Sequence, residues 1–150
     1  MINVRQATEN DLVQILSIYN DVIVHTTAVY DYEPHTLEMR QAWFNTKKEQ
    51  GFPVFVADEG GDILGLSSIG PFRNWAAYKY SVENSIYVAA PARGKGIGKL
   101  LIEKVKQWSK ETGNKTLRLR CNMIRKEAHL FYRHLGFKEI KEQKVFEMHI

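Results

Sequence analysis

The 150-residue sequence has little of several features that mark special classes of protein. It has one cysteine, Cys121, so no disulfide can form within the chain, as is typical of proteins from reducing compartments. No stretch approaches the ~20 consecutive apolar residues that a membrane-spanning helix needs. The first five residues, Met1–Arg5, lack the apolar core of a secretion signal. These observations predict a cytoplasmic protein without a membrane partner.

The sequence also has no large excess of one charge. It carries 21 Lys and Arg against 17 Asp and Glu, a formal net charge of +4 that is spread along the chain. This mild balance permits binding of an anionic small molecule and does not indicate nucleic acid as a partner. There is no H-E-x-x-H motif or Cys/His cluster, so we expect no metal site. Length and composition favour one globular domain, residues 1–150.

Hydrophobic patterns divide the chain into strands and helices. Helical spacing predicts four helices, which follow Thr8, follow Thr36, run on from Ile97, and cover 126–135. Strand-like segments cover 4–7, 53–58, 63–69, 80–88, 116–121, 137–140 and 145–148. The pattern predicts a mixed α/β fold with a central, mostly antiparallel sheet of about six to seven strands, flanked by about four helices.

A short glycine-rich segment, Arg93-Gly94-Lys95-Gly96-Ile97-Gly98, lies between a predicted strand and a predicted helix. Glycines let a ligand approach the backbone closely, and the N–H groups of a helix N-terminus suit a phosphate. The spacing fits neither G-x-x-x-x-G-K-[ST] nor G-x-G-x-x-G, so what remains is R-x-x-G-x-G. The alternative is a tight turn that binds no ligand.

Two motifs in the second half of the chain resemble one family. Arg93-x-x-Gly96-x-Gly98 resembles the acetyl-CoA pyrophosphate loop of the GCN5-related N-acetyltransferase (GNAT) family. The segment from Ala128 to Phe137 resembles that family's A-x-x-F-Y-x-x-x-G-F pattern. Segments in the first half are similar to the phosphinothricin and methionine sulfoximine acetyltransferase branch: 18–21, 26–28, 31–34, 69–73 and 80–88. The resemblance implies a GNAT-like twisted sheet.

The resemblance further implies a cofactor site for acetyl-CoA, without a metal. The residues that it assigns to this site are Ile86, Tyr87, Val88, Arg93, Gly94, Lys95, Gly96, Ile97, Gly98, Arg125 and His134. The strand residues would contribute backbone groups, and a strand N–H there can bond the thioester oxygen. Relatives usually carry Asn at the position of Arg125, and Asn122 lies three residues earlier.

The two catalytic candidates are Glu83 and Tyr132. A carboxylate within a strand of small and apolar residues can accept the proton of an amine, directly or through water. The position of Tyr132 matches the family's tyrosine that faces the cofactor sulfur, where a phenol can protonate the departing thiolate. The alternatives are a Glu83 that only forms a salt bridge and a Tyr132 that only fills the core.

The acceptor site is assigned to a loop and the strand after it. The candidates are Arg73, Ala76, Ala77, Tyr78 and Glu83, with Trp75 and Tyr30 as further walls. Arg73 can clamp a substrate carboxylate. We therefore expect transfer to the α-amine of a small amino acid such as methionine sulfoximine, methionine sulfone or phosphinothricin, by a homodimer. The alternatives are another amine (a protein N-terminus, a polyamine, an aminoglycoside) or a non-catalytic acyl-CoA-binding module.

Overall fold

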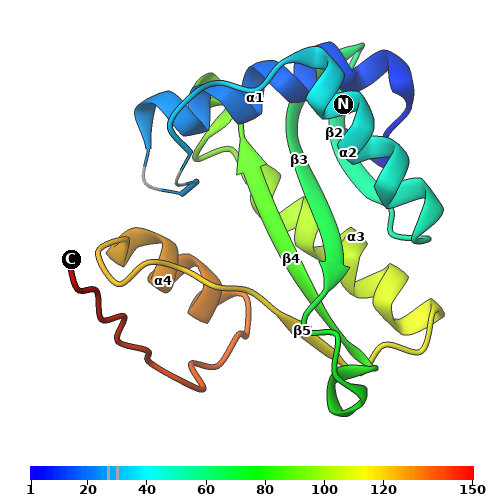
Figure 1. The fold of residues 1–150 in the computed structure, drawn as a ribbon. Helices are drawn as coiled ribbons and strands as arrows, with labels where there is room; N and C mark the ends of the chain where they lie inside the picture. Colours follow the sequence, from blue (N-terminus) through cyan, green and yellow to red (C-terminus); the bar gives the residue numbers. More distant parts are fainter. Residues whose placement is uncertain (27, 30) are drawn as a thin grey trace. The chain divides into compact units, whose positions relative to one another are not determined.

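The computed structural model describes residues 1–26, 28–29 and 31–150, which form two units, Met1–Arg120 and Cys121–Ile150 (Figure 1). The first unit holds a five-stranded sheet in which the strands lie in sequence order. Its strands are β1 (Asn3–Gln6), β2 (Val54–Glu59), β3 (Asp62–Pro71), β4 (Ser81–Val88) and β5 (Thr116–Arg118). All neighbours are antiparallel except β4 and β5, which are parallel. The predicted mixed α/β fold class is confirmed.

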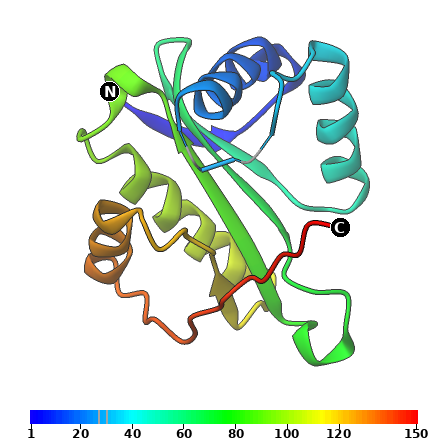
Figure 2. The ribbon, with the colours of Figure 1, turned by 60° about the vertical axis from the view of Figure 1, so that its left-hand side comes forward.

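Three helices cover the two faces of this sheet. α1 (Leu12–His25) and α2 (Leu37–Glu49) pack on one face, and α3 (Ile97–Glu111) packs on the other (Figure 2). The strands serve both layers because successive side chains point to opposite faces. In β2, for example, Val54 and Val56 join the core under α1 and α2, whereas Phe55 joins the core under α3.

The starts of the first two helices follow from local hydrogen bonds. The Thr36 side chain accepts a hydrogen bond from the N–H of Met39 at 3.2 Å, so Thr36 caps α2 as its sequence position predicts. Before α1, the N–H of Thr8 donates to Oδ2 of Asp11 at 2.7 Å across a 3-10 turn, Glu9–Asp11. α2 is longer than the short helix expected from its apolar residues.

The strand count is lower than the six to seven that the sequence predicts. The second unit contains α4 (Lys126–His134), and the described residues that follow it form neither strand nor helix. The expected strands at 137–140 and 145–148 are therefore absent from the structure, and β5 ends at Arg118 rather than at residue 121. A strand needs a neighbour with which to exchange hydrogen bonds, and the two segments do not pair with each other in the structure.

One ion-pair network fastens the start of α1 to the sheet. Arg5 donates to both carboxylate oxygens of Asp11, each at 2.8 Å, and to Oδ2 of Asp58 at 2.8 Å. The hydrogen bonds from Arg5, with those from Thr8, lower the pKa of Asp11 from 3.8 to about 2. The ionised Asp11 therefore stabilises the folded protein.

Replacing Asp11 with asparagine is expected to lower the free energy of unfolding by about 1.5–3 kcal/mol at pH 7, because hydrogen bonds to a charged group are lost. The pKa of Asp11 is depressed in the folded state, so its contribution is full above pH 3.8 and is lost as the pH falls through about 2. The difference between the two proteins should shrink over that window in urea titrations. Asp62→Asn, at an exposed position, is the control. If Asp11→Asn lowers the free energy of unfolding equally at pH 7 and at pH 2, this account is wrong.

Candidate functional site

The outer edge of β4 opens where β5 ends. β5 pairs with β4 only at Ser81, Val82 and Glu83, while β4 continues to Val88. The N–H of Ala89 donates to the carbonyl of Leu64 at 2.9 Å, so the odd-numbered residues of this strand bond to β3. The backbone groups of the even-numbered residues 84, 86 and 88 therefore point toward the side from which β5 has ended. An extended ligand with amide groups can bind along such an edge.

The glycine-rich segment follows directly from this edge. A 3-10 turn, Ala90–Ala92, leads from β4 into Arg93, and α3 begins at Ile97. Gly94 and Gly96 have φ angles of +76° and +82°, a left-handed conformation that favours glycine. A Cβ on either would meet no described heavy atom within 4 Å, so the space above both glycines is open. The predicted turn is confirmed, and phosphate binding by it stays a prediction.

The two cations of this segment differ in their contacts. Nε of Arg93 donates to the carbonyl of Val88 at 3.2 Å, and its Nη2 lies 3.8 Å from Oδ2 of Asp21. Arg93 therefore fastens the loop to the end of β4. Lys95 is exposed next to the first turn of α3, whose leading N–H groups have no acceptor within the helix. Together these groups give the loop the positive potential that an anion needs.

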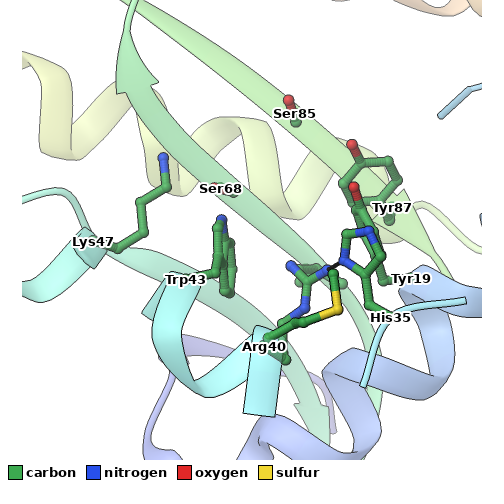
Figure 3. A pocket seen from close by; sticks show the side chains of 10 residues that line it. Tyr19, His35, Arg40, Trp43, Lys47, Ser68, Ser85 and Tyr87 are labelled. Carbon is green, nitrogen blue, oxygen red and sulfur yellow. Dashed lines mark hydrogen bonds between the residues drawn. The ribbon is translucent and has the colours of Figure 1, made fainter. Parts of the chain in front are cut away.

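On the α1 and α2 side of the sheet lies a cavity of about 300 Å³ (Figure 3). Its floor is formed by β3 and β4, and its walls come from α1, α2 and the segment between them. The lining residues are Tyr19, His35, Met39, Arg40, Trp43, Lys47, Leu66, Ser68, Ser85 and Tyr87. This described lining contains two cations and neither Asp nor Glu.

Glu83 lies on the same face of β4 as Ser85, which lines the cavity two residues further on. Its Oε1 accepts a hydrogen bond from Nη2 of Arg120 at 2.9 Å, and the Arg120 side chain is 70% exposed. Its negative charge also reaches Lys47, whose pKa it raises while burial lowers that pKa more strongly. Glu83 thus forms a salt bridge and also stands at the edge of a cavity.

The loop after β3 holds the other predicted acceptor residues. Arg73 is exposed, with its guanidinium carbon 5.3 Å from the centroid of the Phe72 ring. A 3-10 turn, Ala76–Tyr78, follows, and the Tyr78 ring packs edge-on against Phe72 at 5.1 Å. The described lining of the cavity includes none of Arg73, Ala76, Ala77 and Tyr78, so their contact with substrate stays a prediction. Trp75 is exposed, and Tyr30 lies outside the described residues.

The second unit carries the remaining candidates, Tyr132, Arg125 and His134. The Tyr132 ring packs against Phe131 and Phe137, with centroids 5.2 and 5.8 Å away. Arg125 precedes α4 and donates its N–H to the carbonyl of Asn122 at 3.0 Å, and His134 is the last residue of the helix. Their predicted roles toward the cofactor and the thiolate stay predictions.

Arg40 and Lys47 are the residues that reasoning from the sequence missed. Both lie on the side of α2 that also carries Trp43, at spacings of three and four residues. The sequence signal for such residues is a lysine or arginine that falls on the same helical face as the apolar residues, rather than on the opposite face.

Neither a metal site nor a membrane span emerges from the described part of the chain. Its His, Cys, Asp and Glu side chains form no group of three or more that could hold a metal ion. Its helices are all too short or too polar to cross a membrane.

The sequence is similar to proteins of known or assigned activity. One is the L-methionine sulfoximine/L-methionine sulfone acetyltransferase of Pseudomonas aeruginosa, 40% identical over 112 residues. The match covers 74% of this chain and 65% of that protein. The chain thus spans slightly less than two thirds of the length of this curated relative.

Solved structures show the same similarity in three dimensions. An N-acetyltransferase from Staphylococcus aureus superposes with a TM-score of 0.88 at 42% identity, covering 92% of this chain and 84% of that one. A phosphinothricin acetyltransferase from Sinorhizobium meliloti in complex with AcCoA gives a TM-score of 0.85 at 32% identity, covering 91% and 75%. Residues 13–137 match the sequence model of the Acetyltransferase (GNAT) family. The chain, with its open β4 edge and the glycine-rich turn that follows it, belongs to the GNAT family of acetyltransferases.

Proposed function

We propose that this protein is an N-acetyltransferase that moves the acetyl group of acetyl-CoA to the α-amine of a small amino acid. Methionine sulfoximine, methionine sulfone and phosphinothricin are the substrate type. The observation that carries the proposal is the double role of β4. Its outer backbone edge runs into the glycine-rich turn, and one face of the same strand forms the floor of the cavity. The family membership and the activities for which the relatives are named support it.

In this proposal β4 and the loop after it bind acetyl-CoA. The backbone groups of Ile86 and Val88 bind the pantetheine amides and the thioester oxygen, and the N–H groups around Gly96 and Gly98 bind the pyrophosphate. The acetyl thioester supplies an activated acyl group. Because both binding segments are continuous in sequence, they hold the thioester at a fixed place along β4. Holding two reactants in this way lowers the barrier by roughly 7–11 kcal/mol.

Glu83 serves as the general base in this proposal. The α-ammonium of a peptide terminus has a pKa of about 7.7–8.0, and that of a free amino acid is higher because of its own carboxylate, so most of the amine is protonated at neutral pH and cannot attack. The carboxylate takes that proton directly or through water. Its salt bridge to Arg120 is compatible with this role, because Arg120 contacts Oε1 and a carboxylate has a second oxygen that can accept a proton.

Tyr132 is proposed as the general acid that protonates the departing thiolate. Replacing it with phenylalanine should lower kcat by about 10²-fold or more, since proton transfer in the transition state contributes that much. The KM for the amine should change little, because the thiolate forms only as the bond breaks. Steady-state kinetics check this, with Phe131→Leu on the same helix as the control. A Tyr132→Phe enzyme with unchanged kcat would show that Tyr132 is not the general acid.

A panel of amines tests the function as a whole. Release of free thiol from acetyl-CoA is followed with methionine sulfone, methionine sulfoximine, phosphinothricin, a polyamine, an aminoglycoside and a peptide N-terminus as acceptors. Selective thiol release with the amino acids supports the proposal. Thiol release only with another amine would show that the enzyme acetylates that amine instead. Acetyl-CoA binding without thiol release from any acceptor identifies a non-catalytic binding module.

We also propose that the enzyme is a cytoplasmic homodimer. This rests on the resemblance to the phosphinothricin branch and on the single cysteine, Cys121, which suits a reducing compartment. Sedimentation at micromolar concentration measures the assembly, and a monomer would contradict the proposal.

A further inference from the structure

The cavity beside β4 contains an arginine that no carboxylate of the described residues contacts directly. Arg40 is only 3% exposed, with its guanidinium carbon 3.9 Å from the centroid of Tyr19 and 4.6 Å from that of Trp43. Its Nη2 lies 3.0 Å from Nδ1 of His35. Its Nε has no hydrogen-bond partner within the described part of the chain. A buried charge without a counter-ion is costly unless a ligand supplies one.

His35 does not supply the missing negative charge. Its Nε2 lies 2.6 Å from Oδ2 of Asp31. Arginine can only donate, so Nδ1 of His35 accepts from Arg40 and Nε2–H donates to Asp31. The His35 ring therefore lies between the Asp31 carboxylate and the Arg40 guanidinium. The guanidinium keeps its positive charge on the cavity side.

Lys47 is the second cation of the cavity. Its Nζ donates to the carbonyl of Ile69 at 2.7 Å, and a Cβ on Gly70 would come within 3.0 Å of the same atom. Gly70 pairs with Glu83 in the sheet, so Lys47 reaches the part of β4 that carries the proposed base. The ammonium group has three N–H donors, and the Ile69 carbonyl uses one of them.

The spacing of the two cations fits a short molecule with two polar ends. Arg40 and Lys47 are seven residues apart on α2, which places their Cα atoms about 10 Å apart. Figure 3 shows both side chains extending from α2 with the Trp43 ring between them. A volume of about 300 Å³ is at the small end for ligand sites.

We propose that this cavity binds the acceptor amino acid, with Lys47 on its α-carboxylate and Arg40 on the oxygen-bearing head of its side chain. The proposal rests on the proposed function and assigns to Lys47 the role that the sequence assigned to Arg73. The amine and the carboxylate share one carbon, so the groups that recognise them must be neighbours, as Glu83 and Lys47 are. The sulfone, sulfoximine or phosphinate oxygens then accept hydrogen bonds from Arg40, and Trp43 lies along the methylene chain.

The test compares matched acceptors on matched variants. The acceptors are methionine sulfone, the same molecule without its carboxylate (3-(methylsulfonyl)propylamine), and norleucine, whose side chain has no oxygen. Lys47→Met should lower kcat/KM for methionine sulfone by about 10- to 100-fold and for the decarboxylated amine by less than about 3-fold. Arg40→Gln should lower kcat/KM for methionine sulfone by about 10-fold more than for norleucine.

Three controls separate binding from folding. Lys48→Met removes the neighbouring, exposed lysine that pairs with Glu9 at 3.1 Å, and it should leave all three acceptors unchanged. Each variant should bind acetyl-CoA as the unchanged protein does. If Arg40→Gln does not fold, Arg40→Lys replaces it, because lysine keeps the charge and loses the two-pronged donor geometry.

The outcomes separate this inference from the proposed function. Equal losses with and without the carboxylate, or no loss in Lys47→Met, overturn the assignment of Lys47. If Arg40→Gln loses kcat/KM equally for methionine sulfone and norleucine, the assignment of Arg40 is overturned. If Arg73→Ala instead loses kcat/KM only for acceptors that carry a carboxylate, the loop after β3 binds the carboxylate, and the assignment of the cavity is overturned. If the unchanged protein acetylates none of the amino acids, both the inference and the proposed function fail.

Discussion

Replacing Gly96 with valine is expected to weaken acetyl-CoA binding by more than about 100-fold, the effect of closing a site where the backbone must meet a pyrophosphate. Gly96 has a φ of +82° and caps α3, and a β-branched residue is strained in that conformation. Its Cβ would also project into space that is open in the structure, which is where we propose the ligand lies. Isothermal titration calorimetry with acetyl-CoA measures the affinity.

Gly113→Val is the matched control for this prediction. Gly113 follows α3 at its other end, has a φ of +77°, and its Cβ would likewise meet no described atom within 4 Å. Both substitutions therefore impose the same kind of strain on the two ends of one helix. Both should lower the unfolding midpoint, but only Gly96→Val should lose acetyl-CoA. If Gly96→Val binds with undiminished affinity, the assignment of the loop is wrong.

Replacing Glu83 with glutamine is expected to lower kcat/KM at pH 7 by about 10²- to 10⁴-fold, the usual contribution of a general base. Glutamine keeps the shape of the side chain and loses the proton acceptor. The loss should shrink as the pH rises through the pKa of the substrate amine, because the substrate then arrives already neutral. A pH profile of kcat/KM for both proteins checks this.

Arg120→Met distinguishes the base from the salt bridge. If Glu83 acts only by pairing with Arg120, removing either partner should cost the same activity. An exposed ion pair contributes little to stability, about 0–1 kcal/mol, and Arg120 is 70% exposed. Arg120→Met should therefore keep most of the activity that Glu83→Gln loses. Near-full activity of Glu83→Gln at neutral pH would make Glu83 structural.

The turn between β4 and α3 was predictable from the sequence because its causes are local. Gly94 and Gly96 adopt φ values that other residues avoid, and the buried Ile97, Leu101 and Val105 mark one face of the helix that follows. The turn that joins β2 to β3 is also local in origin, since its glycines, Gly60 and Gly61, both have positive φ values. The conformation of these segments is determined by their own residues rather than by distant contacts.

The two expected strands at the end of the chain were wrong because a strand depends on a partner. Residues 137–140 and 145–148 have strand-like side chains, yet neither segment forms a strand in the structure. The cavity residues Arg40 and Lys47 escaped prediction for a related reason. Whether a cation on a helix meets solvent or a buried wall depends on how that helix packs, and here α2 turns both toward the sheet.

Along β4 the side chains alternate between the two faces of the sheet and the backbone groups alternate between its two edges. Substitutions and insertions in this strand should therefore have different effects. The acceptor cavity depends on the side chains of α2 and of one face of β4, whereas the proposed cofactor edge depends on backbone groups that any residue supplies. Substitutions at Arg40 or Lys47 can therefore redirect acceptor choice while leaving the cofactor edge intact. A one-residue insertion before Glu83 would instead turn the carboxylate to the α3 face, while the outer edge would keep backbone donors, now from the odd-numbered residues. This strand tolerates exchange of its residues far better than a change in its length.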